Sequence, residues 1–304
     1  MTGGSGFVGR YLVEALRARG DEVVSASRHG DDSALELSDA ESVRRIVETA
    51  SPDVVFHLAG QAFLPEAYRA PLETLDVNVM GTARLLDALR SAGARGGRSP
   101  RFVFASSAHV YGVAQGAPLR ELLPTRPVDP YGASKAAAES VVFGFARGYG
   151  IDAVVYRGFN QIGPRQDERF AVPSFAHQLA RIAEGGERVM LVGNLEARRD
   201  FLDVRDAVQA VILLAERGES GEVYNVCSGD AVTIGEVLRR LISIAGVPVE
   251  VREDPQRMRP SDNPFVVGDP TKLRERTGWR PAYSLDATLR DIYDDARRRL
   301  GALS

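Results

Sequence analysis

The sequence is poor in cysteine, has no long hydrophobic run and carries little excess charge. Cys227 is the single cysteine among 304 residues, which excludes an internal disulfide and a cysteine-based zinc site. No apolar run approaches the roughly 20 residues that cross a bilayer, and no signal peptide is visible, so we expect a cytoplasmic protein. A net charge of −3 gives no general attraction to nucleic acid or to an anionic membrane. Any anionic ligand must therefore be held by local arginines.

The chain also lacks a strand where its opening motif needs one. Gly3, Gly6 and Gly9 in "TGGSGFVG" recur every third residue, which is typical of the turn that holds a dinucleotide pyrophosphate at a helix N-terminus. Such a turn normally follows a buried strand, yet only Met1 and Thr2 precede it. Because the loss of a central strand would leave neighbouring backbone groups unpaired, we expect the native chain to start upstream of Met1. A glycine-rich turn without a ligand is the alternative.

Strands and helices alternate through the first half of the chain. The expected strands are 21–27, 53–60, 101–107 and 152–160, and the expected helices are 40–50, 77–93 and 129–150. Apolar strands separated by helices predict an α/β protein with a doubly wound parallel Rossmann sheet. After about residue 160 the alternation is lost, and residues 161–175 are expected to be a loop. The predicted domains are a dinucleotide-binding domain, 1–160 with about 205–228, and a smaller substrate lobe, about 161–204 with 229–304.

Arg28 follows the second expected strand, where the ribose of a dinucleotide is recognised. A carboxylate there would accept hydrogen bonds from the 2′-hydroxyl of NAD(H), but "SASRHG" offers Ser27 and Arg28 and no acid. A guanidinium suits a 2′-phosphate, so NADP(H) is favoured and NAD(H) is the alternative. Arg28 could also be a solvated residue at a strand end. The remaining predicted cofactor contacts are Phe7, Val8, Leu58 and Ala59.

Tyr131 and Lys135 in "YGASK" lie one helical turn apart, so their side chains share a helix face. An ammonium ~4 Å from a phenol favours the phenolate by ~4 kcal/mol at an effective dielectric near 20, before desolvation opposes it. This pull would bring the tyrosine toward useful acid–base strength. Ser107, at the end of an expected strand, is placed to hydrogen-bond a substrate oxygen, with Ser106 as the alternative. Taken singly, each could be a chance pair or a strand-end cap.

Together these motifs resemble a known family. The glycine turn, "DVVFHLAG", "VNVMGT", "FASSAHVYG" and "YGASK" are similar to the extended short-chain dehydrogenase/reductases that act on nucleotide sugars, over almost the whole chain. The resemblance implies that Ser107, Tyr131 and Lys135 form the catalytic group and that Lys135 also holds the nicotinamide ribose. Asn78 is expected to be structural and to brace the central strands. No metal ligand is predicted.

Two features favour one reaction within this family. The 4,6-dehydratases place an acid pair after the catalytic serine or threonine, where this chain has Ala108 and His109. Alanine cannot transfer protons, so dehydration by that route is disfavoured. His109 is expected to line the substrate pocket or to be held by a hydrogen bond. "GNLEARRDFLDVRD", "FNQIGPRQ" and "RMRPSDNPFVVGDPTKLRERTGWRP" resemble segments of GDP-mannose 4,6-dehydratases and their partner reductases, with "RPSD" typical of GDP-4-keto-6-deoxymannose reductases.

That resemblance places the nucleotide sugar against the second half of the chain. It implies that Asn160 approaches the diphosphate and that Arg199 and Arg259 clamp it. Guanidinium groups suit this role because they pair bidentately with phosphate oxygens. A surface ion pair between Arg199 and Asp200 or Asp203 is the alternative.

The expected reaction is the NAD(P)H-dependent reduction of the C4 ketone of a GDP-4-keto-6-deoxyhexose. The alternatives are a nucleotide-sugar 4-epimerase, which needs no net reductant, a 4,6-dehydratase, and a non-catalytic nucleotide-sugar sensor. Gln161 and Arg165 replace residues of the "FNHIGPGQ"-type loop, and Asn194 and Glu196 are further candidates for nucleoside recognition, so the exact sugar stays open. The tyrosine-bearing helix, with small and apolar residues along it, is expected to form a homodimer contact.

Overall fold

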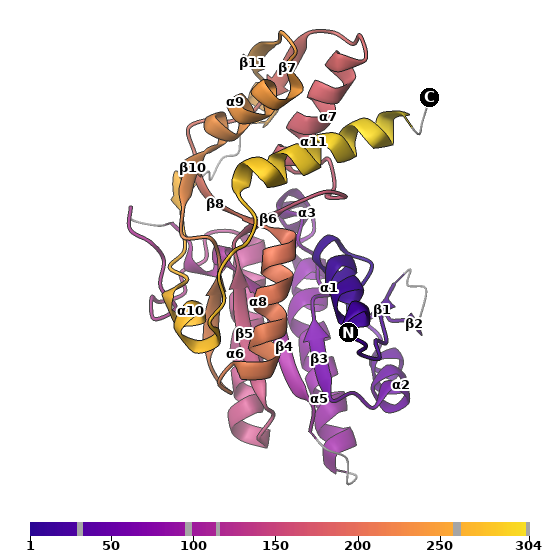
Figure 1. Ribbon diagram of the computed structural model, residues 1–304. Helices are drawn as coiled ribbons and strands as arrows, with labels where there is room; N and C mark the ends of the chain where they lie inside the picture. The colour runs from indigo at the N-terminus through magenta and orange to yellow at the C-terminus, as the bar shows by residue number, and fades with distance from the viewer. Residues whose placement is uncertain (29–32, 95–98, 114–115, 258–262, 302–304) are drawn as a thin grey trace.

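A parallel sheet lies at the centre of the computed structural model, which describes residues 1–28, 33–94, 99–113, 116–257 and 263–301 (Figure 1). Thr2 forms parallel bridges to Ala26 on one side and to His57 on the other, and so joins the two halves of the sheet. The resulting order is β2-β1-Thr2-β3-β4-β5-β9, with every pairing parallel. The strands are β1 (Ala26–Ser27), β2 (Ser33–Ala34), β3 (Val54–His57), β4 (Arg101–Ser107), β5 (Ala153–Gly158) and β9 (Val223–Val226).

Helices cover both faces of this sheet, as a doubly wound α/β fold requires. One hydrophobic core joins the sheet to helices on one face, which are α1 (Phe7–Ala18), α8 (Val204–Arg217) and α10 (Thr271–Thr277). A second core joins it to the helices on the other face, which are α2 (Ala40–Ala50), α5 (Gly81–Ala94) and α6 (Pro130–Tyr149). The predicted fold class is confirmed.

The expected strand over 21–27 is much shorter than its sequence suggests. Only Ala26–Ser27 forms β1, because a ladder needs a paired neighbour and Met1–Thr2 reaches only its carboxyl end. The Met1 ammonium donates to the Val24 carbonyl at 2.6 Å, and beyond that point the pairing ceases. Val23 and Val24 line a cavity of about 270 Å³ beside Ile46 of α2. The start of the native chain stays a prediction.

Most other expected elements are present, with two differences. The helix expected at 77–93 is α5, and five residues of π-helix, Asp76–Met80, precede it. The loop expected over 161–175 is partly wrong, because β6 (Asn160–Ile162) and the start of α7 (Ala171–Ala183) fall within it. The sequence signal for α7 is weak because glycine, proline and charged residues precede its apolar stripe. Two short helices, α3 (Leu64–Arg69) and α4 (Pro71–Leu75), also follow β3.

A smaller lobe lies above the carboxyl ends of the central strands (Figure 1). Its hydrophobic core is separate from the two cores of the sheet. The elements of this lobe are α7, β7 (Val189–Val192), α9 (Ile234–Ala245), β11 (Glu250–Glu253) and α11 (Leu285–Gly301). Between the two parts, β8 (Arg198–Asp203) pairs with β6, β10 (Ala231–Thr233) and β12 (Phe265–Val266). The predicted domain limits stay a prediction, which the separate cores support.

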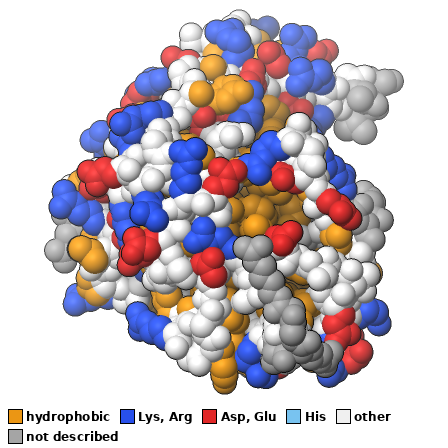
Figure 2. Space-filling view, turned by 60° about the horizontal axis from the view of Figure 1, so that its bottom comes forward, with side chains coloured by type: hydrophobic (Ala, Val, Ile, Leu, Met, Phe, Trp, Pro, Cys, Tyr) orange, Lys and Arg blue, Asp and Glu red, His pale blue; other side chains and the backbone are white. Residues whose placement is uncertain are grey.

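The surface mixes charges of both signs. Figure 2, in which the lower end of Figure 1 is turned toward the viewer, shows basic and acidic side chains interspersed around a hollow where hydrophobic side chains gather. Neither sign dominates this face. In the described part of the chain, no helix combines the length and the apolar character needed to cross a membrane.

Candidate active site

The glycine turn packs so closely that side chains are excluded from it. Gly3 has φ 77°, and a Cβ on it would lie 2.6 Å from the Ala59 nitrogen. A Cβ on Gly9 would lie 2.0 Å from the Gly3 carbonyl oxygen. Gly6 is the N-cap of α1 and offers no side chain to cap the first turn, which also carries no acidic residue. The positive end of the helix dipole therefore faces the turn, a cradle that fits a pyrophosphate.

The end of β1 lies beside this turn. The Gly3 N–H donates to the Ala26 carbonyl at 2.9 Å, so Ser27 and Arg28 follow directly. The Ser27 hydroxyl is buried and has no hydrogen-bond partner among the described residues, while Arg28 is exposed. A buried hydroxyl without a protein partner is uncommon, and it can hydrogen-bond a ligand. Together with an exposed guanidinium it fits a 2′-phosphate, although the roles of Ser27 and Arg28 stay predictions.

The carboxyl end of β3 connects the glycine turn to the tyrosine-bearing helix. Ala59, which touches Gly3, is followed by Gly60. A Cβ on Gly60 would lie 3.4 Å from Lys135 Nζ and 2.8 Å from Asn78 Oδ1. The expected cofactor contacts at the end of β3 therefore lie between the pyrophosphate cradle and the lysine of α6. The residues present fit an extended dinucleotide along this edge of the sheet.

Lys135 is buried and makes a hydrogen bond to the strand that carries the serines. Its Nζ donates to the Ala105 carbonyl at 2.8 Å and lies 5.1 Å from the centre of the Phe104 ring. Burial lowers the pKa of Lys135 to about 8, and the charge of Glu139, one turn further along α6, opposes that fall. The amine is thus poised to change charge just above neutral pH.

Tyr131 and Ser107 lie close to each other, and the pKa of the Tyr131 phenol moves opposite to the predicted direction. Ser107 lowers the pKa of the Tyr131 phenol, yet burial outweighs it and raises that pKa to about 12, and Asp129 raises it further. Lys135 is not among the causes of this shift, because an amine with a pKa of about 8 is already neutral when a phenol with a pKa of about 12 titrates. The phenol is therefore protonated at neutral pH, which is the form that donates a proton.

His109 belongs to the same cluster and has a partner that sequence reasoning missed. His109 Nδ1 and Asp129 Oδ2 are 2.9 Å apart, and the imidazole packs edge to face against the Tyr131 ring with 5.4 Å between centroids. Asp129 also caps α6 by accepting from the Gly132 N–H at 2.7 Å. An aspartate followed by a proline at a helix start is a recognisable capping signal that points to this residue.

Asn78 is structural, as expected, but it does not brace strands. In the π-helix its Oδ1 accepts from the Gln61 N–H at 2.8 Å, and its Nδ2 donates to the Gln61 carbonyl at 3.0 Å and to the Ser134 hydroxyl at 2.9 Å. It therefore ties the loop after β3 to helix α6, which holds Tyr131 and Lys135 in place.

Sheet register places Asn160 close to Ser107, the predicted catalytic serine. Ser107 is opposite Gly158 in the β4–β5 ladder, and Asn160 begins β6 two residues later. Its Nδ2 donates to the Asp200 carbonyl at 3.0 Å, which joins it to β8, the strand that carries Arg199. These two predicted diphosphate contacts therefore lie on neighbouring strands, while Arg259 falls outside the described residues.

Asp200 and Asp203, the alternative ion-pair partners of Arg199, are each engaged by other groups. Asp200 is buried and accepts from the Ser228 hydroxyl and the Gly229 N–H, and Asp203 pairs with Arg205. The Arg199 guanidinium donates to the Asn263 carbonyl at 2.7 Å. For the two nucleoside candidates, the Asn194 side chain accepts from the Glu196 N–H at 2.9 Å. Their roles toward a ligand stay predictions.

The cavity of about 440 Å³ at the carboxyl end of β9 is not this site. It is lined by Ser228, Asp230, Asp269 and Arg274 among others, and by none of the predicted catalytic residues. Within the described residues, no group of three or more histidine, cysteine, aspartate or glutamate side chains is arranged to hold a metal ion.

Comparison with known proteins gives consistent similarities over the whole chain. The family model described as GDP-mannose 4,6 dehydratase matches residues 1–292. GDP-6-deoxy-D-mannose reductase of Pseudomonas aeruginosa is 40% identical over 99% of this chain and 97% of its own length. The solved structure of RMD from Pseudomonas aeruginosa complexed with NADPH has a TM-score of 0.87 and 38% identity, covering 98% of this chain and 97% of that one. The structure of Thermus thermophilus UDP-glucose 4-epimerase complexed with NAD has a TM-score of 0.86 and 32% identity, with 97% of both chains covered.

Proposed function

The chain belongs to the GDP-mannose 4,6-dehydratase family, and from that premise we propose that it is an NADPH-dependent reductase of the C4 ketone of a GDP-4-keto-6-deoxyhexose. The carrying observation is the convergence of Ser107, Tyr131 and Lys135 beside the glycine turn. The similarity to a GDP-6-deoxy-D-mannose reductase supports reduction. Ala108, which stands where the resembling dehydratases carry an acid, disfavours dehydration.

The proposed mechanism assigns one task to each residue of the cluster. When bound, NADPH supplies the hydride that is added to the C4 carbon. Ser107 and Tyr131 donate hydrogen bonds to the carbonyl oxygen, where negative charge develops as the hydride arrives. The Tyr131 phenol then transfers its proton to that oxygen, which completes the alcohol. Because its pKa is about 12, the phenol is protonated at neutral pH and can donate this proton.

Ligand binding is divided between the two ends of the site. We assign the pyrophosphate of the cofactor to the turn at Gly3 and Gly6 and its 2′-phosphate to Ser27 and Arg28, which the orphaned Ser27 hydroxyl supports. Phe7, Val8, Leu58 and Ala59 flank the same edge, and Lys135 holds the nicotinamide ribose. Asn160 and Arg199 contact the sugar diphosphate, with Arg259 assigned by sequence resemblance, and His109 lines the sugar pocket.

A nucleotide-sugar 4-epimerase is the second candidate. The similarity to a UDP-glucose 4-epimerase with NAD supports it, because the same tyrosine chemistry serves both reactions. The two differ in their use of cofactor. An epimerase regenerates its dinucleotide in each turnover, whereas the proposed reductase consumes one NADPH for each sugar.

We also propose that the protein forms a homodimer through the outer face of α6. Tyr149 is 61% exposed, and Val141, Phe143 and Phe145 on the same helix are half-buried, so apolar surface is left uncovered in one chain. Light scattering should give the mass of two chains. Phe145→Glu should lower it to the mass of one, and an unchanged mass would contradict this face.

A panel of nucleotide sugars tests the reaction. The protein is mixed with NADPH and with GDP-4-keto-6-deoxymannose, UDP-glucose or GDP-mannose, and NADPH absorbance is followed. We expect consumption of NADPH with the keto sugar alone. Conversion of UDP-glucose without loss of NADPH would support the epimerase, and formation of a keto sugar from GDP-mannose would support a dehydratase. No turnover with any sugar, combined with intact binding, would support a sensor.

A further inference from the structure

Arg165 has a backbone conformation that is unfavourable for a residue with a side chain. Its φ is 65°, and among the described residues the only other non-glycine residue with positive φ is Ser51, at the end of α2. The left-handed region costs little for glycine and more for arginine. In the resembling "GPGQ" loop a glycine stands at this position. The free-energy cost of this backbone conformation must therefore be offset by favourable contacts, and Arg165 makes several.

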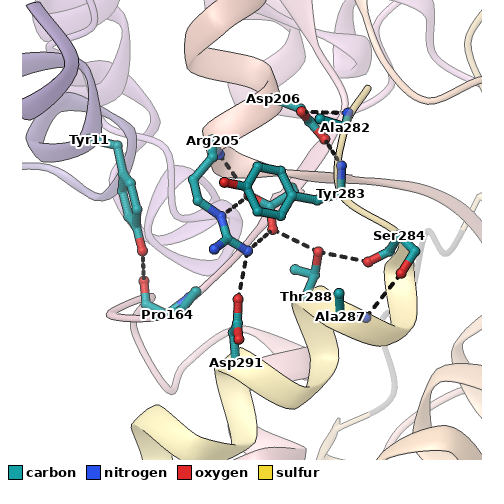
Figure 3. Close-up of polar contacts among 11 residues, drawn as sticks. Tyr11, Pro164, Arg205, Asp206, Ala282, Tyr283, Ser284, Ala287, Thr288 and Asp291 are labelled. Atoms are coloured by element: carbon teal, nitrogen blue, oxygen red, sulfur yellow. Dashed lines mark hydrogen bonds and ion pairs between the residues drawn. The ribbon is translucent and has the colours of Figure 1, made fainter. Parts of the chain in front are cut away.

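The Arg165 side chain is fastened to α1, the helix that begins at the glycine turn. Its Nη1 and Nη2 donate to the two carboxylate oxygens of Glu14 at 2.6 and 2.9 Å. The guanidinium also lies 4.4 Å from the centre of the Tyr11 ring. A planar arginine fork suits both the bidentate pair and the stacking, and a lysine would provide neither. Tyr11 adds a third link, because its hydroxyl donates to the Pro164 carbonyl at 2.9 Å (Figure 3).

The backbone of Arg165 is fastened to the small lobe. Its N–H donates to Asp295 Oδ2 of α11 at 2.7 Å. One turn earlier on α11, Asp291 accepts from the Arg205 guanidinium of α8 at 2.8 Å (Figure 3). At two successive turns, helix α11 is thus linked to α1 through Arg165 and bonded directly to Arg205 of α8. We call Glu14, Tyr11, Arg165 and Asp295 the clasp.

The clasp holds the segment that carries a predicted substrate contact. Segment 160–166 includes both Asn160 and Arg165, and Gln166 Nε2 donates back to the Gln161 carbonyl at 3.0 Å. A Cβ on Gly163 would lie 2.6 Å from Val204 of α8 and 3.6 Å from the Phe7 ring. The segment therefore packs against the first residue of α1, next to the pyrophosphate cradle.

We propose that Arg165 is a positioning residue that couples the two ligands of the site, an inference that rests on the proposed function. A dinucleotide bound in the glycine turn restricts the motion of the first turn of α1. Because the clasp joins α1 to segment 160–166, the motion of that segment is restricted as well. A nucleotide diphosphate that binds at Asn160 then contacts a segment whose conformation is already restricted. Two ligands that order the same segment bind with positive cooperativity, because the second loses less conformational freedom.

Calorimetry with NADPH and GDP as the probes tests this coupling. In the unchanged protein we expect saturating NADPH to tighten GDP binding about 5–10-fold, within the usual range of allosteric coupling. By thermodynamic linkage, GDP must tighten NADPH binding by the same factor. In Arg165→Gly the backbone strain is relieved and the clasp is cut, so we expect a coupling factor below about 2-fold with folding intact.

Two further variants separate the clasp from a general effect on the loop. Glu14→Gln leaves the loop sequence unchanged and removes one end of the ion pair, so it should lower the coupling factor in the same direction as Arg165→Gly. Asp87→Asn removes the carboxylate of an exposed pair with Arg90 within α5 and should leave coupling unchanged. In turnover, Arg165→Gly should raise the KM for the sugar about 5-fold at saturating NADPH while kcat stays within about 2-fold.

The outcomes distinguish this inference from the proposed function. Binding of both probes to the unchanged protein without mutual effect would overturn the coupling and leave the reductase intact. Equal coupling in Arg165→Gly and the unchanged protein would overturn the role of Arg165. Failure of the unchanged protein to bind NADPH at all would overturn the proposed function and the coupling together.

Discussion

Replacing Lys135 with methionine should make the protein more stable and nearly inactive. The side chain is 5% exposed, and its pKa falls from 10.5 to about 8 because burial disfavours the ammonium. At about 1.4 kcal/mol for each tenfold change, this fall corresponds to about 3 kcal/mol against the charged amine at neutral pH. Methionine removes that penalty but loses the hydrogen bond to Ala105, worth about 1 kcal/mol. The expected net gain is about 2 kcal/mol.

The sign of the pH dependence makes this prediction specific. Between pH 8 and 10.5 the unfolded chain binds the Lys135 proton and the folded chain has released it, so the unchanged protein gains stability as pH rises through this window. The advantage of Lys135→Met should therefore be complete below pH 8 and absent above about 10.5. Titration of Tyr131, whose pKa is raised, affects both proteins alike and cancels in the difference.

Denaturant unfolding at several pH values measures the difference in unfolding free energy. The pKa itself can be read by NMR of isotope-labelled lysine Cε, because Lys272 is the only other lysine and the variant identifies the Lys135 signal. We also expect kcat for NADPH oxidation to fall at least about 100-fold. A Lys135 pKa above 10, or a variant less stable than the unchanged protein at pH 7, would refute the reasoning.

Three further predictions concern the cofactor and the proton donor. Tyr131→Phe should lower kcat about 10²–10⁴-fold with GDP affinity unchanged, because only the transferable proton is lost; a parallel loss of binding would indicate a structural tyrosine. Ser27→Asp places a carboxylate beside the 2′-phosphate, so the ratio of kcat/KM for NADPH to that for NADH should fall at least about 10-fold, and an unchanged ratio would contradict the assignment. Gly9→Ala should lower stability by about 1–3 kcal/mol and weaken NADPH binding, since the added Cβ would lie 2.0 Å from the Gly3 oxygen; a stable variant with normal affinity would show that the turn can shift.

The fold was predictable where local pattern and tertiary pairing agree. The helix at 40–50 has the same limits in the structure as in the sequence, because an aspartate caps it and an apolar stripe faces the sheet. The strand over 21–27 was mispredicted in length, since a strand pattern becomes a ladder only along a paired neighbour. Helix α7 is hard to predict because its apolar stripe begins just after a polar, proline-containing segment.

For the candidate site, the sequence indicates which side chains share a helix face but not their electrostatics. The spacing of "YGASK" places Tyr131 and Lys135 on one helix face, but sequence does not show whether the ammonium faces the phenol or the Ala105 carbonyl. Burial then decides the pKa of the phenol, and burial depends on packing from several elements. Long-range partners such as Arg165 with Glu14, 151 residues apart, leave no local signal in the sequence.

Transfer of deuterium from the cofactor tests the central claim most directly. The protein is incubated with NADPH deuterated on the transferring face of the nicotinamide and with GDP-4-keto-6-deoxymannose, and the sugar product is analysed by NMR. The account predicts one deuterium at C4 of the sugar for each NADPH oxidised, with Tyr131→Phe forming this product about 10²–10⁴-fold more slowly. Product without deuterium at C4, or product formed while NADPH stays reduced, would contradict it.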